Sequence, residues 1–138
     1  MEAYLDMARD LHTRTMVSFP NSARMFESAF LLSEALRHNY HVAENRKFLE
    51  NFVGMAVTVL GHAHIHTARL RLNYAWAIHS YHFFGYDGYW NDCAKVIGML
   101  KELTDDIIHR YGKDSDEVQI LIPEIEWLLE YTVDNRLE

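Results

Sequence analysis

Apolar residues recur every three to four positions along most of the chain, and strict apolar–polar alternation is nearly absent. This period is that of an α-helix with one buried face, not that of a strand. Short turns between such segments favour antiparallel helical hairpins. The sequence therefore predicts an all-α fold of about six helices, over approximately residues 2–16, 21–38, 41–60, 65–84, 89–111 and 114–134.

The predicted helices group into hairpins with one flanking helix at each end. A chain of 138 residues is long enough to bury one core, so we expect a single all-helical domain over residues 1–138. The end units of a hairpin stack need a polar outer face. The expected parts are an N-terminal capping helix over 1–18, a hairpin over 21–61, a second hairpin over 65–112, and a C-terminal capping helix over 114–134.

Residues with special backbone or capping properties mark the predicted helix ends. Gly61 and Gly112 suit the positive φ that often follows a helix. Asn39 tolerates the left-handed conformation at an earlier helix end. Asp114 followed by Glu117 forms a capping-box pattern, which predicts that Asp114 caps the last helix.

The middle of the chain repeats itself with a period of 51 residues. Gly61 aligns with Gly112, 51 residues further on, and apolar positions coincide in the helices before these glycines. Those apolar pairs are Leu49 with Leu100, Phe52 with Leu103, and Ala56 with Ile107. A repeated helical hairpin is the usual origin of such a pattern.

The segment "LGHAHIHTA" at residues 60–68 carries the pattern L-G-x-x-H-x-x-T-A. It resembles the junction between tetratricopeptide repeats (TPRs) of the kinesin-light-chain class. The resemblance implies a right-handed stack of helical hairpins that binds proteins or peptides. Two features depart from the family: the period is 51 instead of roughly 42 there or about 34 in TPRs generally, and Ile65 replaces the usual proline. An irregular helical bundle is the alternative architecture.

Aromatic, amide and imidazole side chains gather on the fourth predicted helix and in the Gly-containing loop after it. Tyr and Trp often anchor protein interfaces, and hairpin stacks present their first helices on a concave face. We therefore expect a protein or peptide partner at the 65–84 helix and the 83–90 aromatic loop. Apolar residues left at the ends of a short stack make a homo-oligomer possible. The candidate partner-binding residues are Asn73, Trp76, His79, Tyr81, His82, Tyr86, Tyr89 and Trp90.

Three alternating histidines, His62, His64 and His66, are weak candidates for a metal site. Zinc needs three or four ligands that converge, and residues two apart on a helix point about 200° apart. No HExxH or CxxC pattern accompanies them. We expect His64 to cap the helix that follows. A metal-dependent enzyme using these three histidines is the less favoured alternative.

Composition narrows the remaining function classes. A net charge of -7 disfavours nucleic acid, and the one cysteine, Cys93, fits a reducing compartment. No signal peptide or membrane-spanning run is apparent, so a cytoplasmic location is expected. Catalytic motifs are missing from the sequence, and no cofactor is expected. The sequence predicts a non-catalytic adaptor or regulator; the alternative is a structural subunit of a larger assembly.

Overall fold

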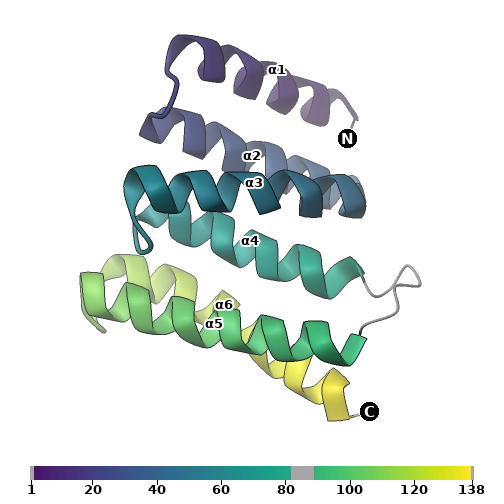
Figure 1. Cartoon of the computed structure of the whole chain (residues 1–138), viewed down its shortest axis with the longest axis vertical. Helices are drawn as coiled ribbons and strands as arrows, with labels where there is room; N and C mark the ends of the chain where they lie inside the picture. The colour runs from purple at the N-terminus through teal and green to yellow at the C-terminus, as the bar shows by residue number, and fades with distance from the viewer. Residues whose placement is uncertain (1, 82–88, 138) are drawn as a thin grey trace.

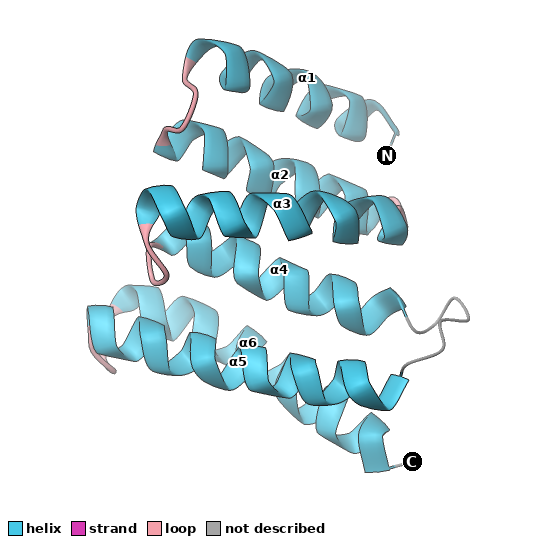
Figure 2. Ribbon diagram, in the orientation of Figure 1, coloured by secondary structure: helices cyan, strands magenta, loops and turns pink. Residues whose placement is uncertain are grey.

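The computed structural model describes residues 2–81 and 89–137, and this part of the chain consists of helices and turns without strands (Figure 2). The predicted all-α fold is confirmed. The fourth helix, predicted to reach residue 84, is described as far as Tyr81. The helices are α1 (Glu2–Ser18), α2 (Ala23–His38), α3 (Val42–Leu60), α4 (Ile65–Tyr81), α5 (Tyr89–Tyr111) and α6 (Asp116–Leu137).

Consecutive helices pack against each other in an antiparallel stack (Figure 1). In addition, α2 packs on α4, and α4 packs on α6, so these three helices form one layer. The second layer contains α3 and α5, which lie in front of α2, α4 and α6 in Figure 1. Helix α1 packs on α2 at the N-terminal end of the stack. The arrangement is that of stacked helical hairpins.

The helices recur with two different spacings. Helix α2 begins at Ala23 and α4 at Ile65, 42 residues later, whereas α6 begins at Asp116, 51 residues after Ile65. The helix ends follow the same rule: Ser18, Leu60 and Tyr111 are separated by 42 and then 51 residues. The repeat visible in the sequence itself has only the longer spacing of 51 residues. By this correspondence α1 is equivalent to α3 and α5, and α2 is equivalent to α4 and α6.

The three helices of the α2–α4–α6 layer begin with equivalent caps. The Met25 amide donates to Ser22 Oγ at 3.3 Å, and the Val118 amide donates to Ser115 Oγ at 3.3 Å. Each bond satisfies one of the amides that a helix start leaves without an intrahelical partner. These caps fix where each helix of the layer starts.

At the start of α4 the cap is His64, as the sequence predicts, because the His66 amide donates to His64 Nδ1 at 3.1 Å. The prediction of Asp114 as the last cap is wrong. Ser115 holds that position and also donates from its hydroxyl to the Gly112 carbonyl at 2.8 Å. This second bond ties the serine to the preceding turn, so α6 begins one residue later than a cap at Asp114 would require.

Both predicted glycine helix ends have positive φ, 94° at Gly61 and 88° at Gly112. The left-handed residue after α2 is Tyr40, with a φ of 62°, and the prediction of Asn39 is wrong. Asn39 keeps a φ of −99° and donates from Nδ2 to the Ala35 carbonyl at 2.7 Å. Because this amide binds the helix end, the chain reverses one residue later.

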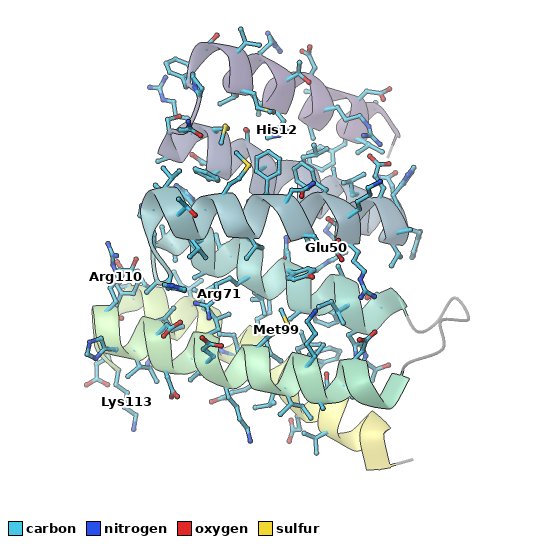
Figure 3. The ribbon with its side chains drawn as sticks, in the orientation of Figure 1. His12, Glu50, Arg71, Met99, Arg110 and Lys113 are labelled. Carbon is cyan, nitrogen blue, oxygen red and sulfur yellow. The ribbon has the colours of Figure 1, made fainter. Side chains whose placement is uncertain are left out.

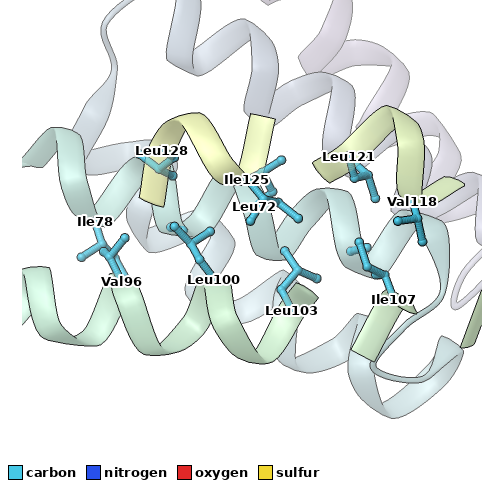
Figure 4. Packing of buried hydrophobic residues seen from close by; sticks show 12 residues of the cluster. Leu72, Ile78, Val96, Leu100, Leu103, Ile107, Val118, Leu121, Ile125 and Leu128 are labelled. Atoms are coloured by element: carbon cyan, nitrogen blue, oxygen red, sulfur yellow. The ribbon is translucent and has the colours of Figure 1, made fainter. Parts of the chain in front are cut away.

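Two cores of different chemistry lie along the stack. The C-terminal core, formed by α4, α5 and α6, is aliphatic (Figure 4). Its buried residues are Ala68, Leu72, Ala75, Ile78, Val96, Leu100, Leu103, Ile107, Val118, Leu121, Ile125 and Leu128. The N-terminal core, formed mainly by α1, α2 and α3 with part of α4, contains aromatic rings such as Phe26 and Phe52.

The N-terminal core also buries polar side chains. Ser33 Oγ donates to Asn45 Oδ1 at 2.8 Å and accepts from Asn73 Nδ2 at 3.2 Å, which joins α2, α3 and α4. His12 of α1 lies 3.0 Å from Ser28 Oγ through its Nδ1, and its ring packs edge-on to Phe52. Buried polar groups of this kind are tolerated where they find hydrogen-bond partners.

Candidate functional site

A row of stacked side chains crosses the α2–α4–α6 layer, and we call Arg37, Trp76, Trp127 and Tyr131 the cross-layer row. Trp76 of α4 stacks on Trp127 of α6 with ring centroids 5.2 Å apart. Trp127 stacks in turn on Tyr131 at 5.1 Å, and it remains 53% exposed. Arg37 of α2 places its Cζ 5.2 Å from the centre of the Trp76 ring. The row therefore combines a cation with exposed aromatic surface.

A pocket of about 360 Å³ opens at the Arg37 end of this row. It lies where the C-terminal end of α2, the start of α3 and the second half of α4 meet. Apolar atoms from Val42, Ala77 and the Trp76 ring form much of its wall. Its lining residues are Arg37, Tyr40, Val42, Asn45, Trp76, Ala77 and Ser80.

The charge of Arg37 is not compensated within the part of the chain that the structure describes. The guanidinium has no ion pair there, and its buried Nη1 has no acceptor. Glu34, one turn earlier, lies instead 3.5 Å from His38 and accepts from Asn73 Nδ2 at 2.9 Å. Desolvating a cation without a counter-ion is costly, so a partly buried and unpaired guanidinium favours an incoming anion.

Trp76, which lines the same pocket, also carries a hydrogen-bond donor. Its Nε1–H is buried and has no acceptor among the described residues. A guanidinium and an indole N–H are both donors only. Because Arg37 lines the pocket, a carboxylate that enters it is attracted by the guanidinium, whereas a cation would be repelled.

Two residues predicted to bind a partner lie in the interior instead of on the layer's surface. Asn73 is 2% exposed and holds Glu34 by the bond described above, while His79 is 1% exposed. The His79 ring packs edge-on to Tyr131, with centroids 4.9 Å apart, and its Nδ1 lies 3.5 Å from Thr132 Oγ1. His79 thus packs against the cross-layer row at Tyr131, whereas Asn73 joins α4 to α2.

The other predicted partner-binding residues divide into two groups. Trp76 lies in the cross-layer row, as described. His82 and Tyr86 lie outside the described residues, and the side chains of Tyr81, Tyr89 and Trp90 do too. The 83–90 aromatic loop is therefore largely beyond the described part of the chain.

Sequence reasoning missed Arg37, Trp127 and Tyr131. For Trp127 a usable pattern exists, because it follows Trp76 by the same 51 residues that separate the starts of α4 and α6. Applying the period to the aromatic residues would have paired the two rings. Nothing in the sequence marks Arg37, since its distance from every described carboxylate is a property of the packed helices.

The three histidines at the α3–α4 junction have different surroundings, with His66 in the first turn of α4. His64 uses its Nδ1 as the helix cap, and burial lowers the pKa of both His64 and His66. The His62 carbonyl accepts from Arg71 Nη1 at 2.8 Å, and the same nitrogen contacts Asp106 at 2.8 Å, so Arg71 joins the turn to α5 (Figure 3). Over residues 2–81 and 89–137, no group of three or more His, Cys, Asp or Glu side chains is placed to hold a metal ion.

The fold and this surface define a stack of helical hairpins with an aromatic and cationic face on its α2–α4–α6 layer. None of the helices in the described part of the chain is both long enough and apolar enough to span a membrane. No family model matches the chain, and neither a curated protein nor a solved structure matches it.

Proposed function

We propose that this protein is a non-catalytic interaction module with TPR-like hairpins, and that its α2–α4–α6 layer binds a peptide segment of a partner protein. The 42-residue spacing between Ala23 and Ile65 supports the TPR-like interpretation, since it equals the family period that the 51-residue spacing lacks. The single cysteine supports a cytoplasmic setting for this binding.

The observation that supports this proposal most strongly is the unpaired charge of Arg37 above Trp76. An unpaired cation indicates that the partner contributes an anionic group. The segment presents an Asp or Glu carboxylate to these two side chains. A hydrogen bond to a charged group contributes on the order of 1.5–3 kcal/mol. Apolar residues beside the carboxylate pack against the exposed ring of Trp127 and the half-buried ring of Tyr131, because aromatic surfaces of this kind anchor interfaces.

This proposal extends the surface expected from the sequence. Helix α4 remains at the centre of the proposed binding surface, where it contributes Trp76. On either side of it, α2 contributes Arg37 and α6 contributes Trp127. A segment that spans the row contacts three consecutive helices of one layer. Specificity then arises from the spacing between the guanidinium and the outer aromatic rings.

Selection from a random peptide library displayed on phage tests the proposal, because such a library samples many combinations of acidic and apolar residues at once. Wild-type protein should enrich peptides with Asp or Glu next to apolar residues, and Arg37→Gln should lose the acidic preference. Binding of an enriched peptide should weaken by roughly tenfold or more in Arg37→Gln, since the charged hydrogen bond is removed.

The matched control is Arg24→Gln, because Arg24 also lies on α2 and over an aromatic ring, 4.6 Å from the centre of Phe19, but outside the pocket. This variant should select the same peptides as the wild type. Failure of the wild-type protein to enrich any sequence family, or an equal loss in both arginine variants, would contradict the proposal.

A further inference from the structure

The outer face of α1 carries an exposed stripe in which Arg14 forms an ion pair with Asp10 of the same helix. Met7 is 70% exposed and Val17 is 79% exposed, the two highest values among the large hydrophobic residues of α1. Asp10 and Arg14 lie between them and are also exposed. The spacing of three, four and three residues places all four side chains on one face of the helix.

This stripe lies opposite the face that holds α1 on the rest of the stack. Leu5, Ala8, His12 and Thr15 are the buried residues of α1, and Leu5 and Ala8 pack with α2. The four stripe residues therefore contribute little to the docking of α1. The stripe thus combines two strongly exposed large apolar side chains with one charge of each sign.

The order of the stripe residues is self-complementary. Asp10 and Arg14 stand two positions on either side of His12, and Met7 and Val17 stand five positions on either side. Two copies of α1 that run antiparallel about a two-fold axis at this point bring Asp10 of each copy to Arg14 of the other. The same symmetry brings Met7 of each copy to Val17 of the other. A two-fold interface requires this kind of pairing.

We propose that the partner of this stripe is a second copy of the chain, bound antiparallel through α1. The pocket beside the stripe, about 280 Å³, offers further apolar surface from Tyr4, Leu11 and Leu31. Asp10 and Arg14 also line that pocket, so charges of both signs stand at the rim where the two copies meet.

The opposite end of the stack differs from α1 in its charge. Ala68 and Ala75 of α4 pack in the core with α5, and their equivalents on α6, 51 residues later, are Gln119 and Glu126. Helix α6 also carries a run of acidic residues, so two copies of it would repel each other. The charges of α6 are Asp116, Glu117, Glu124, Glu126, Glu130, Asp134 and Arg136.

The length of α1 limits the area of the proposed dimer interface and therefore the expected affinity of the dimer. A helix of 17 residues is about 25 Å long, so one helix pair with its flanking pocket falls at the small end of specific interfaces, near 1,200 Å² of total buried surface or below. A dimer of this size forms in a concentration-dependent equilibrium with the monomer. Binding at this end of the stack leaves the α4–α6 part of the cross-layer row accessible.

Analytical ultracentrifugation of the full chain, up to millimolar protein, tests the proposal. The wild type should show a monomer–dimer equilibrium. Asp10→Arg places two like-charged pairs in the interface, and Arg14→Asp does the same with the opposite sign. Each variant alone should raise the dissociation constant by at least about tenfold.

Mixing the two variants provides the decisive measurement. The Asp10→Arg copy carries two arginines on the stripe and the Arg14→Asp copy carries two aspartates, so an equimolar mixture should form heterodimers, and the double reversal in one chain should restore the homodimer. Glu126→Arg on α6 is the control and should leave the equilibrium unchanged.

Three outcomes would overturn the proposal: a wild type that stays monomeric at every concentration, a dimer indifferent to either reversal, or a mixture that remains monomeric. Circular dichroism of each variant separates loss of the dimer from loss of the fold. Peptide selection by the α2–α4–α6 layer uses none of these residues, so the two proposals fail independently.

Discussion

The two cores of the stack bury equivalent positions with opposite chemistry. Val96 of α5 is fully buried among aliphatic side chains, and its equivalent in α3, 51 residues earlier, is Asn45, which is 2% exposed. Asn45 accepts a hydrogen bond from Ser33, whereas Val96 makes only apolar packing contacts with the Leu and Ile side chains of its core. The same place in the hairpin is thus filled once by an amide and once by an aliphatic group.

The difference shows what each core depends on. The C-terminal core gains stability from apolar area removed from water, so the volume of each side chain decides the energy. The N-terminal core depends on polar groups that satisfy each other, and a lost partner costs more than the bond itself contributed. The cross-layer row lies over the boundary between the two, because Arg37 belongs to α2 and Trp127 to α6.

The largest effect is expected when Val96 of the C-terminal core is replaced by Asn, the residue found at the equivalent position of the N-terminal core. Val96→Asn removes a buried aliphatic side chain and introduces an amide with no partner among the surrounding Leu and Ile residues. We expect a loss of about 3–5 kcal/mol in the free energy of unfolding, measured by urea denaturation. Val96→Ala, which only shortens the side chain, should cost clearly less; equal losses would show that the added polarity has no effect.

The reverse replacement should cost less. Asn45→Val leaves the Ser33 hydroxyl without its acceptor, and we expect a loss of about 1–3 kcal/mol. Ser33→Ala also removes an acceptor of Asn73, but because the Ser33–Asn45 bond can be lost only once, the double variant should cost less than the sum of the two single variants. A double variant as unstable as the sum of the two single variants would refute the coupling between these side chains.

The helix caps should contribute about equally in both parts of the stack. Ser22→Ala and Ser115→Ala each remove a side chain that accepts one amide of the first helical turn, and each should cost about 1 kcal/mol. Asp114→Ala serves as the control, because Asp114 is exposed and does not cap α6. A larger loss in the Asp114 variant than in Ser115→Ala would restore the cap predicted from the sequence.

The smallest effect should be a pH dependence to which the N-terminal core contributes through His12. Burial lowers the pKa of His12 below its ordinary value of 6.5, so the unfolded chain binds more protons at mildly acidic pH. The contribution of His12 is therefore complete above about pH 6.5 and decreases as the pH falls below it. His12→Gln should reduce the difference in unfolding free energy between about pH 7.5 and 5.5.

His64 and His66, whose pKa values are also lowered, account for the dependence that remains in that variant. Hydrogen exchange locates the effect: amides of α1 should lose protection at the lower pH before those of α5. Equal loss in both helices would contradict the assignment to His12.

The helices were predictable because their bounds depend on residues close in sequence: the spacing of the apolar residues and the positions of the glycines. The fifth helix has the predicted bounds, and Gly61 and Gly112 end their helices as expected. The buried face of α1 was less accessible to prediction. Leu11 is 42% exposed although it is apolar, while His12 next to it is buried. The His12 imidazole is accommodated because Ser28 offers a hydrogen-bond partner and Phe52 packs against the ring.

The candidate site was predictable only in part. Trp76 follows from the richness of aromatic residues on the fourth helix, and Trp127 would have followed from the period. The role of Arg37 depends on which carboxylates lie near it after folding, and the pattern of residues along α2 does not contain that information. Asn73 and His79 looked like binding residues because polarity in a sequence does not distinguish a buried hydrogen-bonded group from an exposed one.

The stacking of each helix mainly on its neighbours has a consequence for how the chain folds. Contacts between adjacent hairpins are close in sequence, which favours rapid folding by growth from one hairpin to the next. We expect folding to start in the aliphatic α4–α5–α6 unit, since its core needs no matched polar partners. Helix α1 packs chiefly on α2 at one end of the stack, so we expect it to dock after its neighbours and to open before them. The surface proposed for the second copy would then lie on the helix that opens most readily.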